Sequence, residues 1–431
     1  MSLPFHTVLG GTSAALGAAL LAAALGTLAA AQDADLIAGA AVEVSSDDLD
    51  AVLDAVGDAR VVLLGEAWHG DGGAIALRAR LVEALHERLG FDVLAFEADF
   101  WGIHQDWSRA REGGPISAVR DDVWAFWAET AAAAPLWDYV EAQAQSGDTL
   151  HVAGFDTQPR SVRSREELPG WLRTRLLELP DADPEQVETV AGLFAAALGA
   201  DGADPAAVTD DAFALASRLI VRLEYEATDP FVAQAAESLR RNLEGESRDP
   251  GMGENLVWLV TELYSDHKVI VWAHNNHVLM DKWAYWNSPS GEADRARRSA
   301  ATVADWVYLG DVVRRAFGPA AVSIATVPHE GTYSPDIGPV LNGQPADLDS
   351  VLTLPPAPPG TVEAALAERG HDVAFVDLRP LRSRVGLVPS RVLHFAFDAD
   401  PAALRLADGW DGLLFLRRTH GLNEVAAPPR P

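Results

Sequence analysis

The chain of 431 residues is long enough for one large domain or for two lobes that share a core, and its 48% hydrophobic and 22% charged residues exclude a disordered chain. With 33 Lys and Arg against 63 Asp and Glu, the formal net charge is −30, which argues against nucleic acid or an anionic membrane surface as a partner. The chain has no cysteine, which excludes disulfides, thiolate metal sites and a cysteine nucleophile.

The N-terminal residues predict an export segment. Residues 8–31 carry no charge, and the closing Ala29-Ala30-Ala31 has the small residues of a secretory cleavage site. The first Lys or Arg is Arg60, so the usual positive start of a signal peptide is missing, and the apolar stretch is also long enough for an uncleaved anchor. We therefore exclude 1–31 from the fold as a signal peptide or N-terminal anchor. We expect an exported protein, periplasmic or extracellular, with or without a membrane tether.

Short apolar runs rich in Val, Leu, Ile and Phe predict buried strands. Between the first two runs, residues 74–89 place apolar side chains on one stripe of a helix that Gly90 closes. A strand, a helix and a strand at this spacing form a βαβ unit, so we expect an α/β fold with a mixed, largely parallel sheet flanked by helices. The predicted strands are 60–65, 92–96, 150–155, 268–273 and 321–327, followed by 370–377 and 411–416.

A helical segment interrupts this pattern. Residues 165–247 contain amphipathic runs around an Asp-, Gly- and Pro-rich loop at 199–206, and we interpret them as a helical insertion or lid. The predicted helical runs are 170–178, 184–198, 209–227 and 231–244. The α/β catalytic core would then consist of two parts, 45–164 and 248–425, on either side of the insertion.

A polar residue follows each of the first five apolar runs. The strand ends carry Glu66 with His69, Glu97-Ala98-Asp99, Asp156, His274 with His277, and His329-Glu330. In an open parallel α/β sheet, ligands bind outside the carboxyl ends of the strands. Five such ends with acids and imidazoles are hard to explain as turn chemistry alone, so the sequence predicts that they converge on one polar cleft.

The residue types at these ends suit acid–base chemistry. Glu66 and His69 are about one turn apart in GEAWHG, where a carboxylate can orient an imidazole and make it a better general base. Arg78 could hold a carboxylate or a developing oxyanion. Glu97 directly follows a strand, so we expect a desolvated carboxylate with a raised pKa or a partner for Arg78. As an alternative, Glu66 could be an N-cap acid and His69 a surface histidine. For Arg78 the alternative is a solvated arginine on the helix face, and spacing alone favours this alternative.

His274 and His277 lie three residues apart in WAHNNH and could both point into the cleft. As metal ligands they would need further donors, which Glu66, His69 and Glu97 could supply. The alternative is one packing or catalytic histidine and one loop histidine. We favour two functional imidazoles without a tightly bound metal, and we therefore expect no metal and no cofactor.

Several catalytic motifs are absent. The sequence has no G-x-S-x-G elbow, no Walker A loop, no G-x-G-x-x-G after a strand and no H-E-x-x-H. Because cysteine is also missing, the common acyl-enzyme routes lose support. The remaining nucleophile is water, activated by a histidine with the help of a carboxylate.

The motifs GEAWHG and VWAHNNHV, in this order, resemble the erythromycin esterase family, as do FEAD around Glu97 and RDPGMGENLVWL at 248–259. The likeness covers roughly residues 45–425. The resemblance implies a mixed α/β core with a deep cleft, and hydrolysis of a macrolide lactone ester in the members that carry antibiotic resistance. It also implies that His69 is the general base that activates water, with Glu66 beside it. The family's other polar active-site positions fall on Arg78, Glu97, His274 and His277.

We therefore expect a hydrolase that cleaves a carboxylic ester or lactone of a small-molecule substrate. One rival is a metal-dependent hydrolase or peptidase that uses the same cleft, and another is a non-catalytic module that binds haem, a metal or a small apolar ligand. Trp68 occupies a position where family members often have a small residue, and the export segment does not suit a cytoplasmic resistance enzyme. Both features leave the identity of the substrate open.

Overall fold

The computed structural model describes residues 29–45, 48–147, 150–297, 306–335, 337–341, 346–393 and 401–424. Most of the predicted export segment lies outside these residues, and its last three belong to a helix over 29–39. Among the described helices, none combines the length and the hydropathy needed to cross a bilayer.

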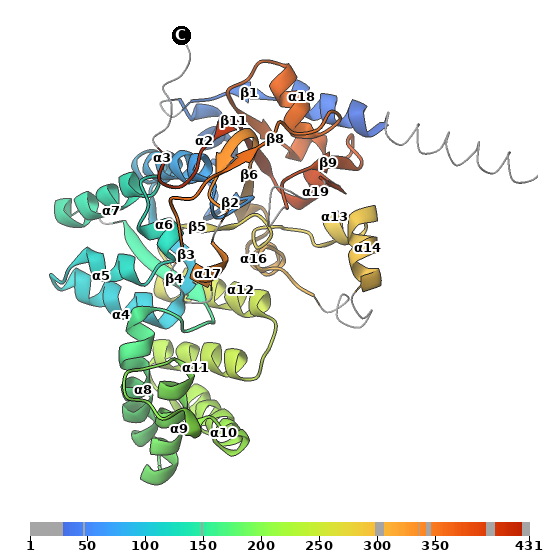
Figure 1. The fold of residues 1–431 in the computed structure, drawn as a ribbon. Coiled ribbons are helices and arrows are strands. Elements are labelled where there is room, and N and C mark those ends of the chain that lie inside the picture. The colour runs from blue at the N-terminus through green and yellow to red at the C-terminus, as the bar shows by residue number, and fades with distance from the viewer. Residues whose placement is uncertain are drawn as a thin grey trace, which may run out of the picture.

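Over the described residues, the centre of the protein is a nine-stranded mixed sheet. The strand order is β1-β8-β11-β6-β2-β5-β3-β4, and β7 pairs with β6 beyond this path (Figure 1). The strands from β11 to β4 pair in parallel, whereas β8, β1 and β7 pair antiparallel to their neighbours. The prediction of a mixed, largely parallel sheet is confirmed.

The strands of this sheet are β1 (Val42–Glu43), β2 (Val61–Glu66), β3 (Phe91–Asp99), β4 (His151–Asp156), β5 (Lys268–His274), β6 (Ala321–Tyr333), β7 (Leu352–Leu354), β8 (Val373–Asp377) and β11 (Gly412–Thr419). A separate antiparallel pair consists of β9 (Val388–Ser390) and β10 (Ala402–Leu404).

The central strands are apolar at nearly every position because both faces of the sheet are covered. Successive side chains of a strand point to opposite faces. Accordingly, Leu63 and Ala95 belong to one hydrophobic cluster, whereas Leu64 and Phe96 belong to the cluster on the other face. A strand buried on both faces has no polar alternation, which is why its polar residues collect at its ends.

Helix α3 (Gly72–Leu89) connects β2 to β3 and carries clear end signals. The Asp71 side chain accepts a hydrogen bond from the backbone N–H of Ala74 at 2.8 Å, and Gly90 ends the helix at a φ of 68°. A positive φ is adopted by glycine with little strain, as the sequence indicated for this position.

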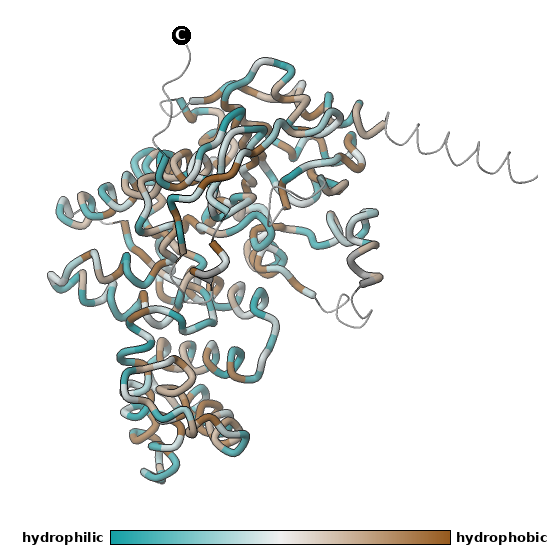
Figure 2. The backbone as a smooth tube through the Cα atoms, viewed as in Figure 1, coloured by the Kyte–Doolittle hydropathy of each residue, from teal (hydrophilic) through white to brown (hydrophobic). Residues whose placement is uncertain are grey.

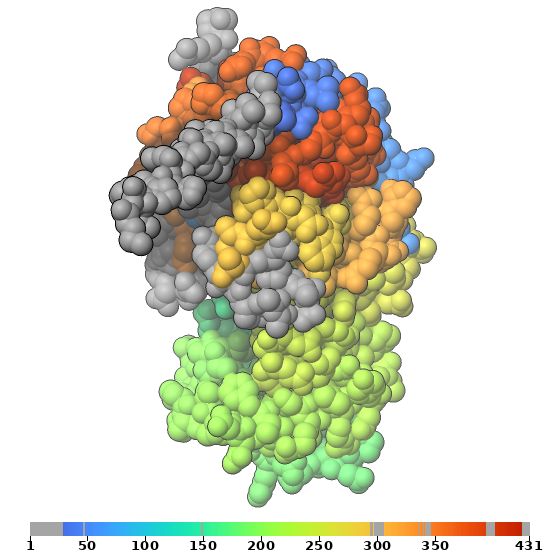
Figure 3. Space-filling model, turned by 90° about the vertical axis from the view of Figure 1, so that its right-hand side faces the viewer, coloured from blue at the N-terminus to red at the C-terminus, as the bar shows by residue number. Residues whose placement is uncertain are grey.

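Four helices form a lobe beside the sheet, and all but the first turn of the first helix lies in the range 165–247 interpreted above as an insertion. They are α8 (Val162–Leu177), α9 (Pro184–Ala197), α10 (Asp210–Glu226) and α11 (Pro230–Leu243). The lobe projects from one end of the molecule (Figures 1 and 3), and its helices alternate between hydrophobic and hydrophilic stretches (Figure 2). Leu168 and Ile220 of the lobe share a hydrophobic cluster with Phe100 of the core, so the lobe packs directly on the core.

The remaining helices surround the sheet. They are α2 (Asp50–Val56), α4 (Phe100–Arg111), α5 (Ile116–Asp121), α6 (Ala125–Ala128), α7 (Ala134–Ser146), α12 (Arg248–Trp258), α13 (Trp283–Trp286), α14 (Pro289–Arg297), α16 (Leu309–Phe317), α17 (Gly338–Leu341), α18 (Val362–Glu368) and α19 (Leu406–Gly409).

One predicted strand end is wrong. Strand β6 continues to Tyr333 because β11 pairs with it in parallel from Ile324 to Gly331, beyond the point where its pairing with β2 ends, and β7 pairs with its last three residues. His329 and Glu330 therefore lie inside a strand and not at its carboxyl end, and Glu330 pairs with Arg418 of the neighbouring β11 at 2.7 Å.

Candidate active site

Four of the predicted strand ends meet at one edge of the sheet. Strands β2, β5, β3 and β4 are consecutive neighbours and run parallel, so their carboxyl ends lie side by side. Glu66 stands opposite His274 in the register of β2 and β5. Glu97 on β3 and Asp156 on β4 follow along the same edge. These ends supply the polar side chains of the candidate site.

His69 is held by a buried carboxylate. Its Nδ1 lies 2.8 Å from Oε1 of Glu66, so the imidazole donates an N–H to Glu66 and keeps its proton on Nδ1. Glu66 is fully buried, and the same oxygen accepts a hydrogen bond from Nε1 of Trp127 at 2.8 Å. Its other oxygen pairs with Nη2 of Arg78. Glu66 is therefore fixed from two sides before it orients His69.

The ring of His69 is enclosed by aromatic side chains. It stacks on Phe126 with ring centroids 4.7 Å apart and an interplanar angle of 7°, and Trp127 meets it edge-on at 5.1 Å. Burial lowers the pKa of His69 to about 4, against the opposing charge of Glu97. The imidazole is therefore neutral near pH 7. Its Nε2 has no hydrogen-bond partner among the described residues, and its side chain is 12% exposed.

Arg78 is a structural partner of Glu66. Its side chain is fully buried, its Nη1 donates to the carbonyls of Leu64 and Ala273 at 3.1 and 3.3 Å, and its guanidinium carbon lies 3.9 Å from the ring centroid of Trp272. The expectation of a solvated arginine is wrong. So is the expected pairing of Arg78 with Glu97, because Arg78 reaches the carboxylate at the end of β2.

His274 is buried, and both of its ring nitrogens face the backbone. Nε2 lies 2.8 Å from the carbonyl oxygen of Ala67, and Nδ1 accepts from the N–H of Asn276 at 3.1 Å. This pairing requires a neutral ring with its proton on Nε2. Burial lowers the pKa of His274, in agreement with that state. Ala67 lies in the loop that carries the candidate base His69, so its hydrogen bond to His274 fixes this loop. The ring centroids of His274 and His69 are 5.2 Å apart.

His277 bridges two carboxylates and is positively charged. Its Nδ1 lies 2.7 Å from Asp249, and its Nε2 lies 3.2 Å from Glu97. Burial alone would lower the pKa of His277, but the two carboxylates outweigh burial and raise the pKa to about 10. His69 and His277 thus have opposite protonation states at neutral pH within one site.

The pKa of Glu97 differs from the sequence-based expectation. Burial would raise this pKa, but His277 and Arg248 outweigh burial and hold the pKa well below its usual range. One carboxylate oxygen contacts Nη2 of Arg248 at 2.8 Å, and the other accepts from the backbone N–H of His274 at 3.2 Å. Glu97 is therefore a buried anion that connects two cations and is not a protonated acid.

Arg248 and Asp249, at the start of α12, were not recognised from the sequence as site residues. The Nε and Nη2 atoms of Arg248 donate to Asp156 at 2.5 to 3.1 Å, and Nη2 also reaches Glu97. These contacts raise the pKa of Arg248, although burial opposes them. The only sequence signal was the motif RDPGMGENLVWL, whose charged residues had no predicted partner.

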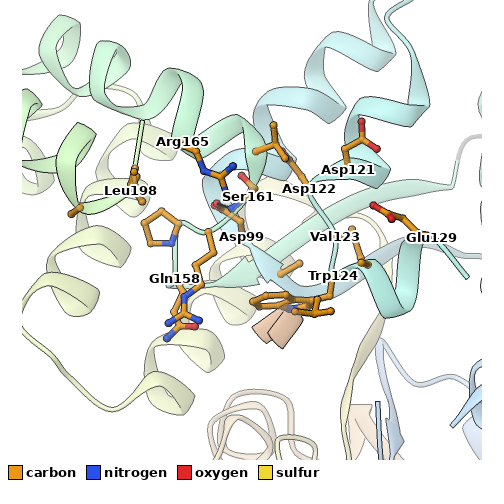
Figure 4. Close-up of a pocket in the computed structure, with 18 of the residues that line it drawn as sticks. Asp99, Asp121, Asp122, Val123, Trp124, Glu129, Gln158, Ser161, Arg165 and Leu198 are labelled. Atoms are coloured by element: carbon orange, nitrogen blue, oxygen red, sulfur yellow. Dashed lines mark hydrogen bonds between the residues drawn. The ribbon is translucent and has the colours of Figure 1, made fainter. Parts of the chain in front are cut away.

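A cavity of about 710 Å³ opens beside this cluster, between the core and the helical lobe (Figure 4). Ala98, next to Glu97 in β3, and Gln158, two residues after Asp156, line it. Trp124 forms part of its wall and donates its Nε1 proton to the carbonyl of Glu97 at 2.7 Å. Its ring is nearly parallel to that of Phe126, which stacks on His69. The cavity is thus separated from the candidate base by one aromatic ring.

The lobe contributes the opposite wall of the cavity. Arg165 of α8 and Leu198 after α9 face Trp124 and Asp122 across it (Figure 4). Both the core and the lobe therefore contact a molecule bound there. Within the described ranges, no group of three or more His, Asp or Glu side chains is arranged to hold a metal ion.

Comparison with known proteins assigns the family. The family model described as erythromycin esterase matches residues 86–419, which is more than half of the chain. The chain belongs to the erythromycin esterase family. The match begins after GEAWHG, so Glu66, His69 and Arg78 precede it, whereas Glu97, His274 and His277 lie within it.

A curated relative and three solved structures are similar to the chain over most of its length. A putative hydrolase of Bacillus subtilis (strain 168), YbfO, is 24% identical over 87% of each chain. A Bacillus cereus protein of known structure has a TM-score of 0.67 at 18% identity, over 92% of this chain and 99% of its own. A succinoglycan biosynthesis protein reaches 0.65 at 13% identity, over 91% and 98%. A mutant of the erythromycin esterase EreC, in its open conformation, reaches 0.61 at 15% identity, over 89% and 96%.

These similarities support two conclusions. The solved structures share the fold of this chain, and at sequence identities of 13–18% they support a conclusion about the fold alone. The family description and the name of the Bacillus subtilis relative both indicate a hydrolase.

Proposed function

We propose that this protein hydrolyses a carboxylic ester or a lactone with a water molecule that His69 activates. The observation that carries the proposal is the state of His69. Its Nδ1–H donates to the buried Glu66, its Nε2 is left without a partner among the described residues, and its lowered pKa keeps it neutral. A neutral imidazole with one oriented nitrogen and one accessible nitrogen is the arrangement of a general base.

The reaction follows from this arrangement. Water gives a proton to Nε2 of His69 as its oxygen attacks the carbonyl carbon. The imidazolium that forms is stabilised by its hydrogen bond to the Glu66 carboxylate. When the tetrahedral intermediate collapses, His69 returns the proton to the leaving alkoxide. Neither a serine nor a cysteine nucleophile is needed, in keeping with the absence of G-x-S-x-G and of cysteine.

The other predicted site residues act around this base. Arg78 and Trp127 hold Glu66, and His274 holds the loop that carries His69. In our proposal, Glu97 and His277 form a fixed pair of charges that orients polar groups of the substrate and the water. All of them would affect the rate mainly through geometry and electrostatics.

The cavity defines the size of substrate that we propose. Its volume of about 710 Å³ lies in the range of about 300–1,000 Å³ typical of sites for drug-sized ligands. A macrolide lactone is one member of the proposed substrate class, and the EreC relative supports its inclusion in a test. The apolar N-terminal stretch supports the further proposal that the enzyme acts outside the cytoplasm.

The test is a substrate screen with matched variants. Purified wild-type protein would be incubated with macrolides, simple lactones and aryl esters, and the carboxylic acid product would be measured by mass spectrometry. We expect the wild-type protein to turn over at least one of these compounds and His69→Ala to lose that turnover. The control His371→Ala should keep the wild-type turnover, because the imidazole of His371 pairs with Glu43 far along the sheet. Circular dichroism would verify that both variants fold. If the wild-type protein turns over no ester or lactone, the proposal is wrong.

A further inference from the structure

A water attack on an ester needs a donor for the oxygen that becomes negative. Such donors contribute a large share of the rate enhancement in acyl transfer. Among the cations of the candidate site, Arg78 cannot serve because its guanidinium is fully buried and occupied by Glu66, Leu64 and Ala273. The imidazolium of His277 has both N–H groups directed at carboxylates. The Nε atom of Arg78 has no partner within the described part of the chain but is buried, so neither cation presents a free donor to substrate.

Arg248 does have a free donor. Its Nε and Nη2 atoms are held by Asp156 and Glu97, but no described residue accepts a hydrogen bond from its Nη1. The side chain is 28% exposed, whereas the two carboxylates that hold it are buried. Because the guanidinium is planar and its other edge is clamped, the direction of the Nη1–H bonds is fixed before substrate arrives.

The position of Arg248 also fits this role. Glu97 accepts from Nη2 of Arg248 at 2.8 Å and from the backbone N–H of His274 at 3.2 Å, and the ring centroid of His274 lies 5.2 Å from that of His69, so Arg248 and His69 border the same part of the site. The carboxylates that hold Arg248 lie near the end of β3 and at the end of β4, and Ala98 and Gln158, one and two residues after them, line the cavity. A carbonyl group bound at this edge of the sheet would meet Arg248 and His69 together.

We propose that Arg248 is the catalytic residue that binds the oxyanion in ester hydrolysis. The inference rests on the proposed function. As the water oxygen bonds to the carbonyl carbon, the π pair of the carbonyl moves to its oxygen, which accepts hydrogen bonds from Nη1 of Arg248. The water proton goes to Nε2 of His69. On collapse the pair returns to re-form the carbonyl, the carbon–oxygen ester bond breaks, and the leaving alkoxide takes the proton from His69.

The experiment compares Arg248→Ala, Arg248→Lys and the control Arg173→Ala, whose arginine pairs with Glu188 on the helical lobe. The probes are p-nitrophenyl butyrate and the best substrate of the screen, with kcat and KM measured separately. We expect Arg248→Ala to lose about 10²–10³-fold in kcat with KM changed only a few-fold. Arg248→Lys keeps the positive charge but lacks the planar guanidinium with its several N–H donors, and we expect an intermediate loss of kcat. The control should match the wild-type protein.

Rescue distinguishes a donor to substrate from a purely structural arginine. Added methylguanidinium should restore part of the kcat of Arg248→Ala, and methylammonium should restore less. If kcat falls less than about threefold in both Arg248 variants, or if it falls without guanidinium rescue in folded protein, the assignment is wrong while the proposed function stands. Should Arg248→Ala fail to fold, Arg248→Lys carries the test, and wild-type kcat in that variant overturns the assignment. Wild-type protein without any turnover would overturn the proposed function first.

Discussion

The doubly paired imidazolium of His277 should make the stability of the protein depend on pH above neutrality. Asp249 and Glu97 outweigh burial and raise the pKa of His277 from 6.5 to about 10. One pKa unit corresponds to about 1.4 kcal/mol, so the bound proton contributes at most about 5 kcal/mol to the free energy of unfolding. Between these two pKa values the folded chain holds a proton that the unfolded chain lacks. The contribution is therefore complete below pH 6.5 and is lost as the pH rises towards about 10.

Urea titrations followed by tryptophan fluorescence would measure this dependence for the wild-type protein, His277→Gln and His371→Gln. Glutamine has no proton to lose in this range, so the wild-type free energy of unfolding should fall more steeply with pH than that of His277→Gln, by up to about 1.4 kcal/mol per pH unit. His371→Gln, at the imidazole that pairs with Glu43, should keep the wild-type slope. Equal slopes for the wild-type protein and His277→Gln would refute the reasoning.

The remaining predictions concern the pH profile, one hydrogen bond and metal dependence. The kcat/KM for ester hydrolysis should fall when the pH is lowered through about 4, where His69 gains a proton. It should also fall when the pH is raised through about 10, where His277 loses a proton. A decrease of kcat/KM that already begins near neutral pH on the acid side would contradict this prediction. Trp127→Phe keeps the ring beside His69 but leaves a buried Glu66 oxygen without that donor, which costs about 1–3 kcal/mol. The melting temperature and kcat should both fall, and unchanged values would argue against the role of Trp127. Dialysis against EDTA should leave activity intact, because in the proposed function His69 activates the water, and a loss that one metal restores would favour a metal-dependent hydrolase.

The strands of the sheet could be predicted because continuous apolar runs in the local sequence indicate that they are buried. The runs at 60–65 and 268–273 are apolar throughout and end in polar residues, and they form β2 and β5 with shifts of one residue. Strand β6 was predicted to end at 327 because its outer half looks polar. Its continuation depends on pairing with β11 and, for its last three residues, with β7, and local sequence gives no sign of these partners.

The polar residues at the strand ends could be predicted, but their pairing could not. The order β2-β5-β3 places a strand between Glu66 and Glu97, and this order decides which carboxylate faces Arg78. Arg248 was missed because its partner Asp156 lies 92 residues earlier, on the other side of the helical lobe. The protonation states of Glu97 and His277 depend on this long-range pairing, so local sequence could not reveal them.

The central claim is that His69 takes the proton from the attacking water. The most direct measurement is the rate of ester hydrolysis by folded His69→Ala protein, with and without added imidazole. We expect kcat to fall by about 10²–10⁴-fold, and free imidazole to restore part of it because a base in the vacated space replaces the missing ring. A His69→Ala protein that hydrolyses the ester at the wild-type rate would contradict the claim.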